Sequence, residues 1–162
     1  MLAGGLLALA VADGAETAAR AALGATFAAE AAITAATACF PSPPADLAGW
    51  RDATERFAAA CLAGFDDEVA RAGGARADYA TTLLAVVLGP PYLAFLSVGD
   101  ANLVAQREPG GPALVLPSRP GCHAVPLTAP DRRAAMRSGV LADTALTAVA
   151  LGADALLVAA RT

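Results

Sequence analysis

The order of helical and extended patterns most narrows what this chain can fold into. Residues 17–38 and 47–72 carry apolar side chains three and four positions apart, which predicts two successive long helices. We expect Thr17 to cap the first, the proline-rich stretch at 40–44 to end it, and Gly73-Gly74 to end the second. No extended segment separates the helices. The alternating order of a parallel βαβ fold is therefore excluded, and an α+β domain is expected.

Extended, apolar segments surround the two helices. Residues 6–12 form a continuous apolar run, as in a strand covered on both faces, and residues 79–88 and 92–98 flank a Gly-Pro-Pro turn, which predicts a hairpin. We also expect a helix at 141–151. The remaining expected strands lie at residues 103–107, 113–116, 124–127 and 154–160. A chain of 162 residues suits one domain built from these elements.

Composition excludes several classes of function. The formal net charge is −4 and the basic residues are scattered, which argues against a nucleic-acid partner. Cys39, Cys61 and Cys122 are odd in number and lack metal-ligand spacing, so buried thiols in a cytoplasmic protein are expected rather than disulfides or a zinc site. No run reaches the roughly 18–20 apolar residues that cross a bilayer, so we expect no membrane partner.

The first residues allow a second interpretation. Residues 2–12 form an apolar run of signal-peptide length, and its last three residues, 10–12, resemble a small-residue cleavage site. No Lys or Arg precedes the run, and Asp13-Gly14 then introduces a turn. A buried strand explains the same residues, and a secreted, alanine-rich protein stays as the alternative.

Two aspartates follow expected strands directly. Asp13 precedes Gly14 at the end of the first strand, and Asp100 follows Gly99 at the end of the second strand of the hairpin. A carboxylate at a strand end can hold a hard cation, which prefers oxygen ligands, although an ordinary turn explains Asp-Gly equally well. We expect the two carboxylates to lie within about 12 Å of each other, the reach of a hydrated ion cluster with bonds of about 2–2.6 Å.

These two motifs, in this order and spacing, resemble the metal-dependent serine/threonine protein phosphatases of type 2C. That family carries an apolar strand ending in Asp-Gly, two helices, an Ala-Thr-rich strand and a Val-Gly-Asp turn. Here they correspond to residues 6–14, the helical pair, residues 80–87 and residues 98–100. Glu16 and Thr17 stand where bacterial members have Gly and Ser. The resemblance covers residues 6–116 and 154–160.

The resemblance implies a central antiparallel β-sandwich flanked by α-helices on both outer faces. It also implies a site for two or three Mg²⁺ or Mn²⁺ ions. By match to the motifs, Asp13 would bridge two ions, and the Gly14 carbonyl would bind one of them. Asp100 would serve either a third, weaker ion or the second shell of the site. A metal-activated water would then hydrolyse phosphoserine or phosphothreonine in a phosphorylated protein substrate.

The chain also departs from the family pattern. Family members carry a preceding strand pair with a phosphate-binding arginine, and further ligand aspartates after a late strand. In one register Arg161 stands where such an aspartate belongs. In the other register, shifted by one residue, an Asp-Gly would follow Thr162 in a longer chain. We therefore expect a single phosphatase-like domain truncated at both ends, and a poor phosphatase as it stands. The alternative is a non-catalytic phosphatase-like module that binds or regulates a partner. The oligomeric state stays open.

The other polar residues receive structural interpretations. His123 adjoins Cys122, and neighbours in an extended segment point apart, so a loop histidine is expected rather than a catalytic one. The acidic run at 66–68 is expected on a solvated helix face. Arg132, Arg133 and Arg137 are expected in a solvated loop.

Overall fold

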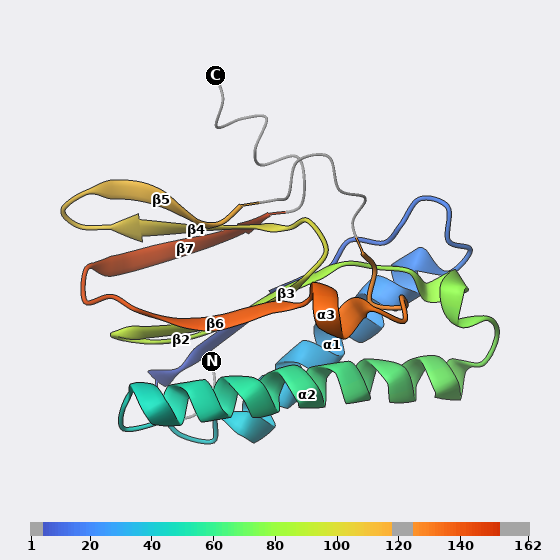
Figure 1. Ribbon diagram of the computed structural model, residues 1–162, viewed down its shortest axis with the longest axis horizontal. Coiled ribbons are helices and arrows are strands. Elements are labelled where there is room, and N and C mark those ends of the chain that lie inside the picture. The colour runs from blue at the N-terminus through green and yellow to red at the C-terminus, as the bar shows by residue number, and fades with distance from the viewer. Residues whose placement is uncertain (1–4, 118–124, 153–162) are drawn as a thin grey trace.

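The structure is a computed structural model that describes residues 5–117 and 125–152 (Figure 1). Its elements are β1 (Leu7–Val11), α1 (Ala21–Cys39), α2 (Leu47–Ala72), the 3-10 helix η2 (Arg76–Tyr79), β2 (Leu83–Gly89), β3 (Tyr92–Val98), β4 (Asn102–Arg107), β5 (Gly111–Leu116), α3 (Arg132–Ala135), β6 (Arg137–Ala142) and β7 (Leu146–Gly152).

The strands form two antiparallel sheets. One has the order β1-β2-β3-β6 and the other the order β5-β4-β7. The three-stranded sheet covers one face of the four-stranded sheet, and α1 and α2 lie side by side on the opposite face (Figure 1). The expected α+β sandwich is confirmed. The expectation of helices on both outer faces is not met within the described residues, where the long helices cover only the four-stranded sheet.

The alternation of side chains along β2 explains why the sheet is covered on both faces. Leu83, Ala85 and Val87 belong to the core beneath the helices, whereas Leu84 and Val86 belong to the core between the sheets. Successive strand residues point to opposite faces, so a continuous apolar run serves both cores. The continuous apolar sequence of 83–88 is therefore the signature of a middle layer.

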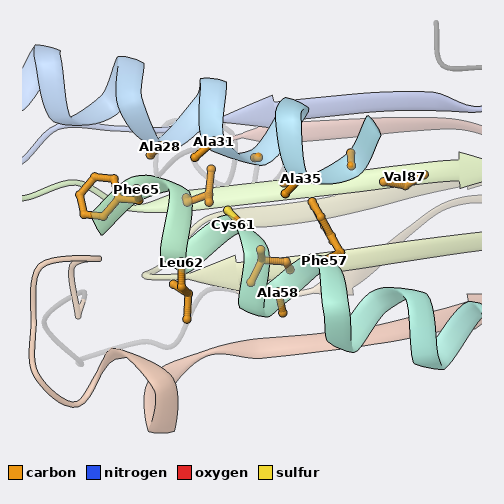
Figure 2. Close-up of a cluster of buried hydrophobic side chains, with 14 of the residues drawn as sticks. Ala28, Ala31, Ala35, Phe57, Ala58, Cys61, Leu62, Phe65 and Val87 are labelled. Atoms are coloured by element: carbon orange, nitrogen blue, oxygen red, sulfur yellow. The ribbon is translucent and has the colours of Figure 1, made fainter. Parts of the chain in front are cut away.

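Small residues allow the two long helices to approach closely. Ala28, Ala31 and Ala35 of α1 are buried, and α2 contributes larger side chains such as Phe57 and Phe65 to the same cluster (Figure 2). A Cβ atom on Gly64 of α2 would lie 3.3 Å from the Cβ of Ala31. The alanine-rich composition thus serves helix packing against aromatic residues of the neighbouring helix.

The start of α1 differs from the prediction. The helix begins at Ala21, its N-cap is Arg20, and no side chain caps it, so Thr17 is not the cap. Backbone pairing with the segment before β2 explains the delay: the Ala15 N–H binds the Ala80 carbonyl at 2.9 Å, and the Arg20 N–H binds the Asp78 carbonyl at 2.8 Å. The bounds of α2 match the prediction. Asp46 caps it by accepting the Gly49 N–H at 2.8 Å, and Gly73 ends it at φ +68°.

The helix predicted at 141–151 is wrong, because β6 and β7 occupy these residues. Asp143 turns the chain between them by accepting the Ala145 N–H at 2.9 Å. Pairing with β3 and β4 overrides the helical preference of the alanines and leucines. Residues 125–127 are not a strand. Residue 124 and the strand predicted at 154–160 lie outside the described residues.

The composition of α1 allows a role that the sequence alone did not suggest. By length and composition alone it could cross a membrane, although Gly24, Thr26 and Glu30 interrupt the run of apolar residues. In the structure it packs beside α2 and over β1 and β2. Its apolar character is therefore accounted for in part by this packing.

Candidate functional site

Both candidate aspartates lie at the same end of the four-stranded sheet. β1 and β3 each pair antiparallel with β2, so they run in the same direction and end together. Asp13 follows β1, and Asp100 follows β3. The two strands are separated by two strand spacings, about 10 Å in total. Asp13 is exposed and Asp100 is half-buried, and the separation of their carboxylates stays a prediction.

The backbone of Asp13 is held by the two threonines that precede β2. Its carbonyl oxygen accepts the Thr82 N–H at 2.8 Å and the Thr81 hydroxyl at 2.8 Å. The Thr82 hydroxyl also lies 3.4 Å from this oxygen, so its lone pairs are already engaged within the protein. The carboxylate is therefore the oxygen-bearing group that Asp13 can offer to a ligand.

Gly14, the next residue, pairs with the segment before β2 without using its own backbone groups. It forms an isolated antiparallel bridge with Thr81, and the two hydrogen bonds of this bridge come from their neighbours, Ala15 to Ala80 and Thr82 to Asp13. The N–H and C=O of Gly14 take no part in these two bonds. A side chain here would collide with α1, since a Cβ atom would lie 2.7 Å from the backbone carbonyl of Ala21. Glycine at this position lets the turn pack directly on the first turn of α1.

Gly99 sets the second turn against Thr82. Its φ of +108° lies in a region that favours glycine, and a Cβ atom would lie 2.5 Å from the Cγ2 of Thr82. Thr82 therefore contacts both turns: its N–H binds the first, and its side chain packs on the second. The sequence interpretation named the aspartates and missed the threonines that connect them.

Arginine residues that the sequence interpretation placed in a solvated loop are engaged in the structure. Arg137 lies on β6, where its guanidinium donates to the Pro117 carbonyl at 2.6 Å and lies within 3.5 Å of the Ser97 hydroxyl and the Gly99 carbonyl. It thus adds a positive charge beside the Asp100 turn. Arg132 forms a two-nitrogen fork on Asp66, so Asp66 is not simply a solvated member of its acidic run. Arg133 is exposed, as expected, and Cys122 and His123 lie outside the described residues.

The donor set fits a metal centre only in part. Carboxylates and a backbone carbonyl are the ligands that Mg²⁺ and Mn²⁺ prefer. However, residues 5–117 and 125–152 contain no group of three or more His, Cys, Asp or Glu side chains able to hold a metal ion. Two hard cations need about six ligands each, and water fills only part of each shell. The described residues alone do not form a complete site for two ions.

Comparisons with known proteins identify the family of the chain. A family model described as Protein phosphatase 2C matches residues 1–156. Among curated proteins, none matches the chain.

Solved structures resemble the chain over most of its length. The catalytic domain of the serine/threonine phosphatase PstP, in complex with two manganese ions, superposes with a TM-score of 0.54 at 18% identity, covering 85% of this chain and 62% of its own. A Stage II Sporulation E family protein from Thermanaerovibrio acidaminovorans gives 0.52 at 21% identity, covering 92% and 69%. A bacterial serine phosphatase gives 0.59 at 12% identity, covering 95% and 72%. At these identities the likeness establishes the fold, and the chain spans less than two thirds of the PstP domain.

Proposed function

Because this chain belongs to the protein phosphatase 2C family, we propose that it supplies part of a metal-dependent site that hydrolyses phosphoserine or phosphothreonine in proteins. One observation supports this most strongly. The Asp13 and Asp100 turns end two strands that run in the same direction, and both turns contact Thr82 between them. Two carboxylates therefore reach the same end of the sheet from positions 87 residues apart in the sequence.

The proposed ligands are the Asp13 carboxylate, the Gly14 carbonyl and the Asp100 carboxylate. The saturated Asp13 carbonyl favours the carboxylate as the ligand group of that residue. Gly14 lies in a bridge whose two hydrogen bonds leave its carbonyl out. A bound Mg²⁺ or Mn²⁺ would lower the pKa of a water molecule and offset the negative charge of a phosphate group. The protein's own contribution is to hold the oxygen ligands at a rigid sheet end.

A second candidate function is a phosphatase-like module that binds a partner without turnover. The absence of a three-residue metal-ligand group from the described part of the chain favours it. Glu16 in the Asp13 turn, where bacterial members carry glycine, adds to this. Arg161, the second departure from the family pattern, lies outside the described residues.

A Mn²⁺ titration joined to a phosphatase assay tests the proposal. We expect the 162-residue chain to bind Mn²⁺ weakly and to show little or no hydrolysis of p-nitrophenyl phosphate, because it offers few oxygen ligands. Asp13→Asn should abolish Mn²⁺ binding, whereas Asp67→Asn, at a position of α2 remote from both turns in the sequence, should leave it unchanged.

The adjoining coding sequence on both sides decides between the two functions. If the longer chain turns over substrate with Mn²⁺ and Asp13→Ala abolishes that turnover, the enzyme hypothesis holds. A longer chain that is folded and inactive supports the binding module. Strong Mn²⁺-dependent turnover by the 162-residue chain itself would show that the described ligands suffice.

A further inference from the structure

An ion-paired cluster joins three elements that are far apart in the sequence. Asp66 of α2 accepts both terminal nitrogens of Arg132 of α3, with Nη1 at 2.8 Å from Oδ1, and it accepts Nη2 of Arg76 of η2 at 2.7 Å. The Arg132 side chain is only 12% exposed, against 36% for Asp66 and 40% for Arg76. A two-nitrogen fork on a carboxylate fixes the orientation as well as the distance. We call Asp66, Arg76 and Arg132 the Asp66 clamp.

The same two guanidiniums bind the backbone just before α3. Arg132 Nη1 donates to the Leu127 carbonyl at 2.8 Å, and Arg76 donates to the Thr128 carbonyl at 3.1 Å and to the Leu127 carbonyl at 3.3 Å. Each arginine therefore bridges the carboxylate and a carbonyl. The Asp66 clamp holds residues 127 and 128 against the C-terminal half of α2.

Leu127 passes this restraint on to the candidate site. Its side chain is fully buried, and its N–H donates to the Thr81 carbonyl at 2.8 Å. Thr81 in turn donates its hydroxyl to the Asp13 carbonyl at 2.8 Å. Hydrogen bonds thus connect Asp66 to the two arginines, the arginines to Leu127, Leu127 to Thr81, and Thr81 to Asp13. Within Leu127 and Thr81 the connection is covalent. None of the clamp residues is adjacent in sequence to Asp13, and the clamp acts through backbone groups.

We propose that the Asp66 clamp positions the Asp13 turn. Loss of the Asp66 charge would leave two guanidiniums close together without a counter-charge, and their repulsion would release the carbonyls of residues 127 and 128. The hydrogen bond from the Leu127 N–H to the Thr81 carbonyl would then weaken, and the backbone of Thr81 would be held only on its Gly14 side. The effect on metal affinity rests on the proposed function, whereas the effect on the order of the turn does not. The three residues are positioning residues, since they act on the candidate ligands through Leu127 and Thr81.

Asp66→Asn and Glu68→Gln provide a matched comparison. Each removes one negative charge from α2, but Glu68 pairs with Arg71 on the same helix at 2.5 Å and takes no part in the Asp66 clamp. Arg132→Lys keeps the positive charge and loses the fork. Two quantities are measured in the 162-residue chain: amide hydrogen exchange at Leu127 and Thr82, and the Mn²⁺ dissociation constant. Thr82 is chosen because its N–H binds the Asp13 carbonyl.

Asp66→Asn should speed exchange at both Leu127 and Thr82 by about tenfold and weaken Mn²⁺ binding by about tenfold, the lower end for loss of an outer partner of a metal ligand. Arg132→Lys should give a smaller change in the same direction, and Glu68→Gln none. Faster exchange at Leu127 with unchanged exchange at Thr82 would overturn the proposal, as would equal effects of Asp66→Asn and Glu68→Gln. If the unaltered chain binds no Mn²⁺, the proposed ligands of this chain do not suffice to hold an ion, and the Thr82 amide still decides whether the clamp positions the turn.

Discussion

The hydroxyl of Thr81 lies 2.8 Å from the carbonyl oxygen of Asp13 and donates to it across 68 residues of sequence. The Thr81 side chain is fully buried, and the next residue sends its N–H to the same carbonyl. Asp13 is thus exposed, while its backbone carbonyl is held by hydrogen bonds from Thr81 and Thr82. Under the proposed function, such a backbone would hold the Asp13 carboxylate in place before an ion binds.

Thr81→Val tests this hydrogen bond directly. Valine has nearly the same shape, so the change removes the hydroxyl donor and leaves the packing intact. We expect the free energy of unfolding to fall by about 1–2 kcal/mol, because one buried hydrogen bond is lost. Urea denaturation measures the loss. Thr81→Ser keeps the hydroxyl and removes the buried methyl group, so it reports the packing contribution separately. A Thr81→Val variant as stable as the unaltered chain would show that the hydrogen bond contributes nothing.

Gly99→Ala should disturb the Asp100 turn for two reasons. The φ of +108° strains any residue with a Cβ atom, and that atom would lie 2.5 Å from the Cγ2 of Thr82. Gly111→Ala separates these causes, because Gly111 has a φ of +79° and no atom within 4 Å of the point where a Cβ would stand. We expect Gly111→Ala to cost about 1 kcal/mol and Gly99→Ala clearly more. Equal melting temperatures for the two variants would argue against the Thr82 contact.

Gly24→Ala should be destabilising although Gly24 lies within α1. Helix propensity alone predicts a gain of about 1 kcal/mol for alanine. A Cβ atom at this position, however, would lie 2.3 Å from the carbonyl oxygen of Tyr79, a backbone atom of η2 that cannot move aside cheaply. Calorimetric melting of the variant decides the sign. Ala22→Gly, at an exposed position of the same helix, reports the propensity contribution alone.

Cys61 should make stability decrease at alkaline pH. Burial raises the pKa of its thiol to about 12 from an ordinary value of 9.0. Between these values the unfolded state releases the proton while the folded state keeps it. The contribution of the buried, protonated Cys61 thiol to the free energy of unfolding is therefore fully present below about pH 9. It is lost as pH rises, by up to about 1.4 kcal/mol per pH unit.

Urea unfolding from about pH 7 to about pH 10.5 under reducing conditions measures this dependence. Cys61→Ala should flatten the alkaline decline. Cys39→Ala should alter it less, since Cys39 is only half-buried, although burial raises the pKa of that thiol too. A decline that is unchanged in Cys61→Ala would assign it to other groups.

Local sequence predicted the helix α2 and the pairing of β2 with β3, although β2 begins at Leu83 and not at residue 79, which ends η2. The Asp46 cap, the apolar stripe and Gly73 fix α2 by contacts within a few residues. It failed at residues 141–151, where pairing with β3 and β4 outweighs local preference. It also failed at the start of α1, because residues 15–20 hydrogen-bond to residues 78–80 instead of continuing the helix.

The same division holds for the candidate site. That Asp13 and Asp100 each follow a strand, with a glycine in each turn, could be predicted because a continuous apolar run and an adjacent Asp-Gly or Gly-Asp are local features. That both turns contact Thr82, that Thr81 binds the Asp13 backbone, and that Arg132 pairs with Asp66 became visible only in the folded chain. These contacts join residues 17 to 69 positions apart, and hydrogen bonds over such separations depend on how the whole chain packs.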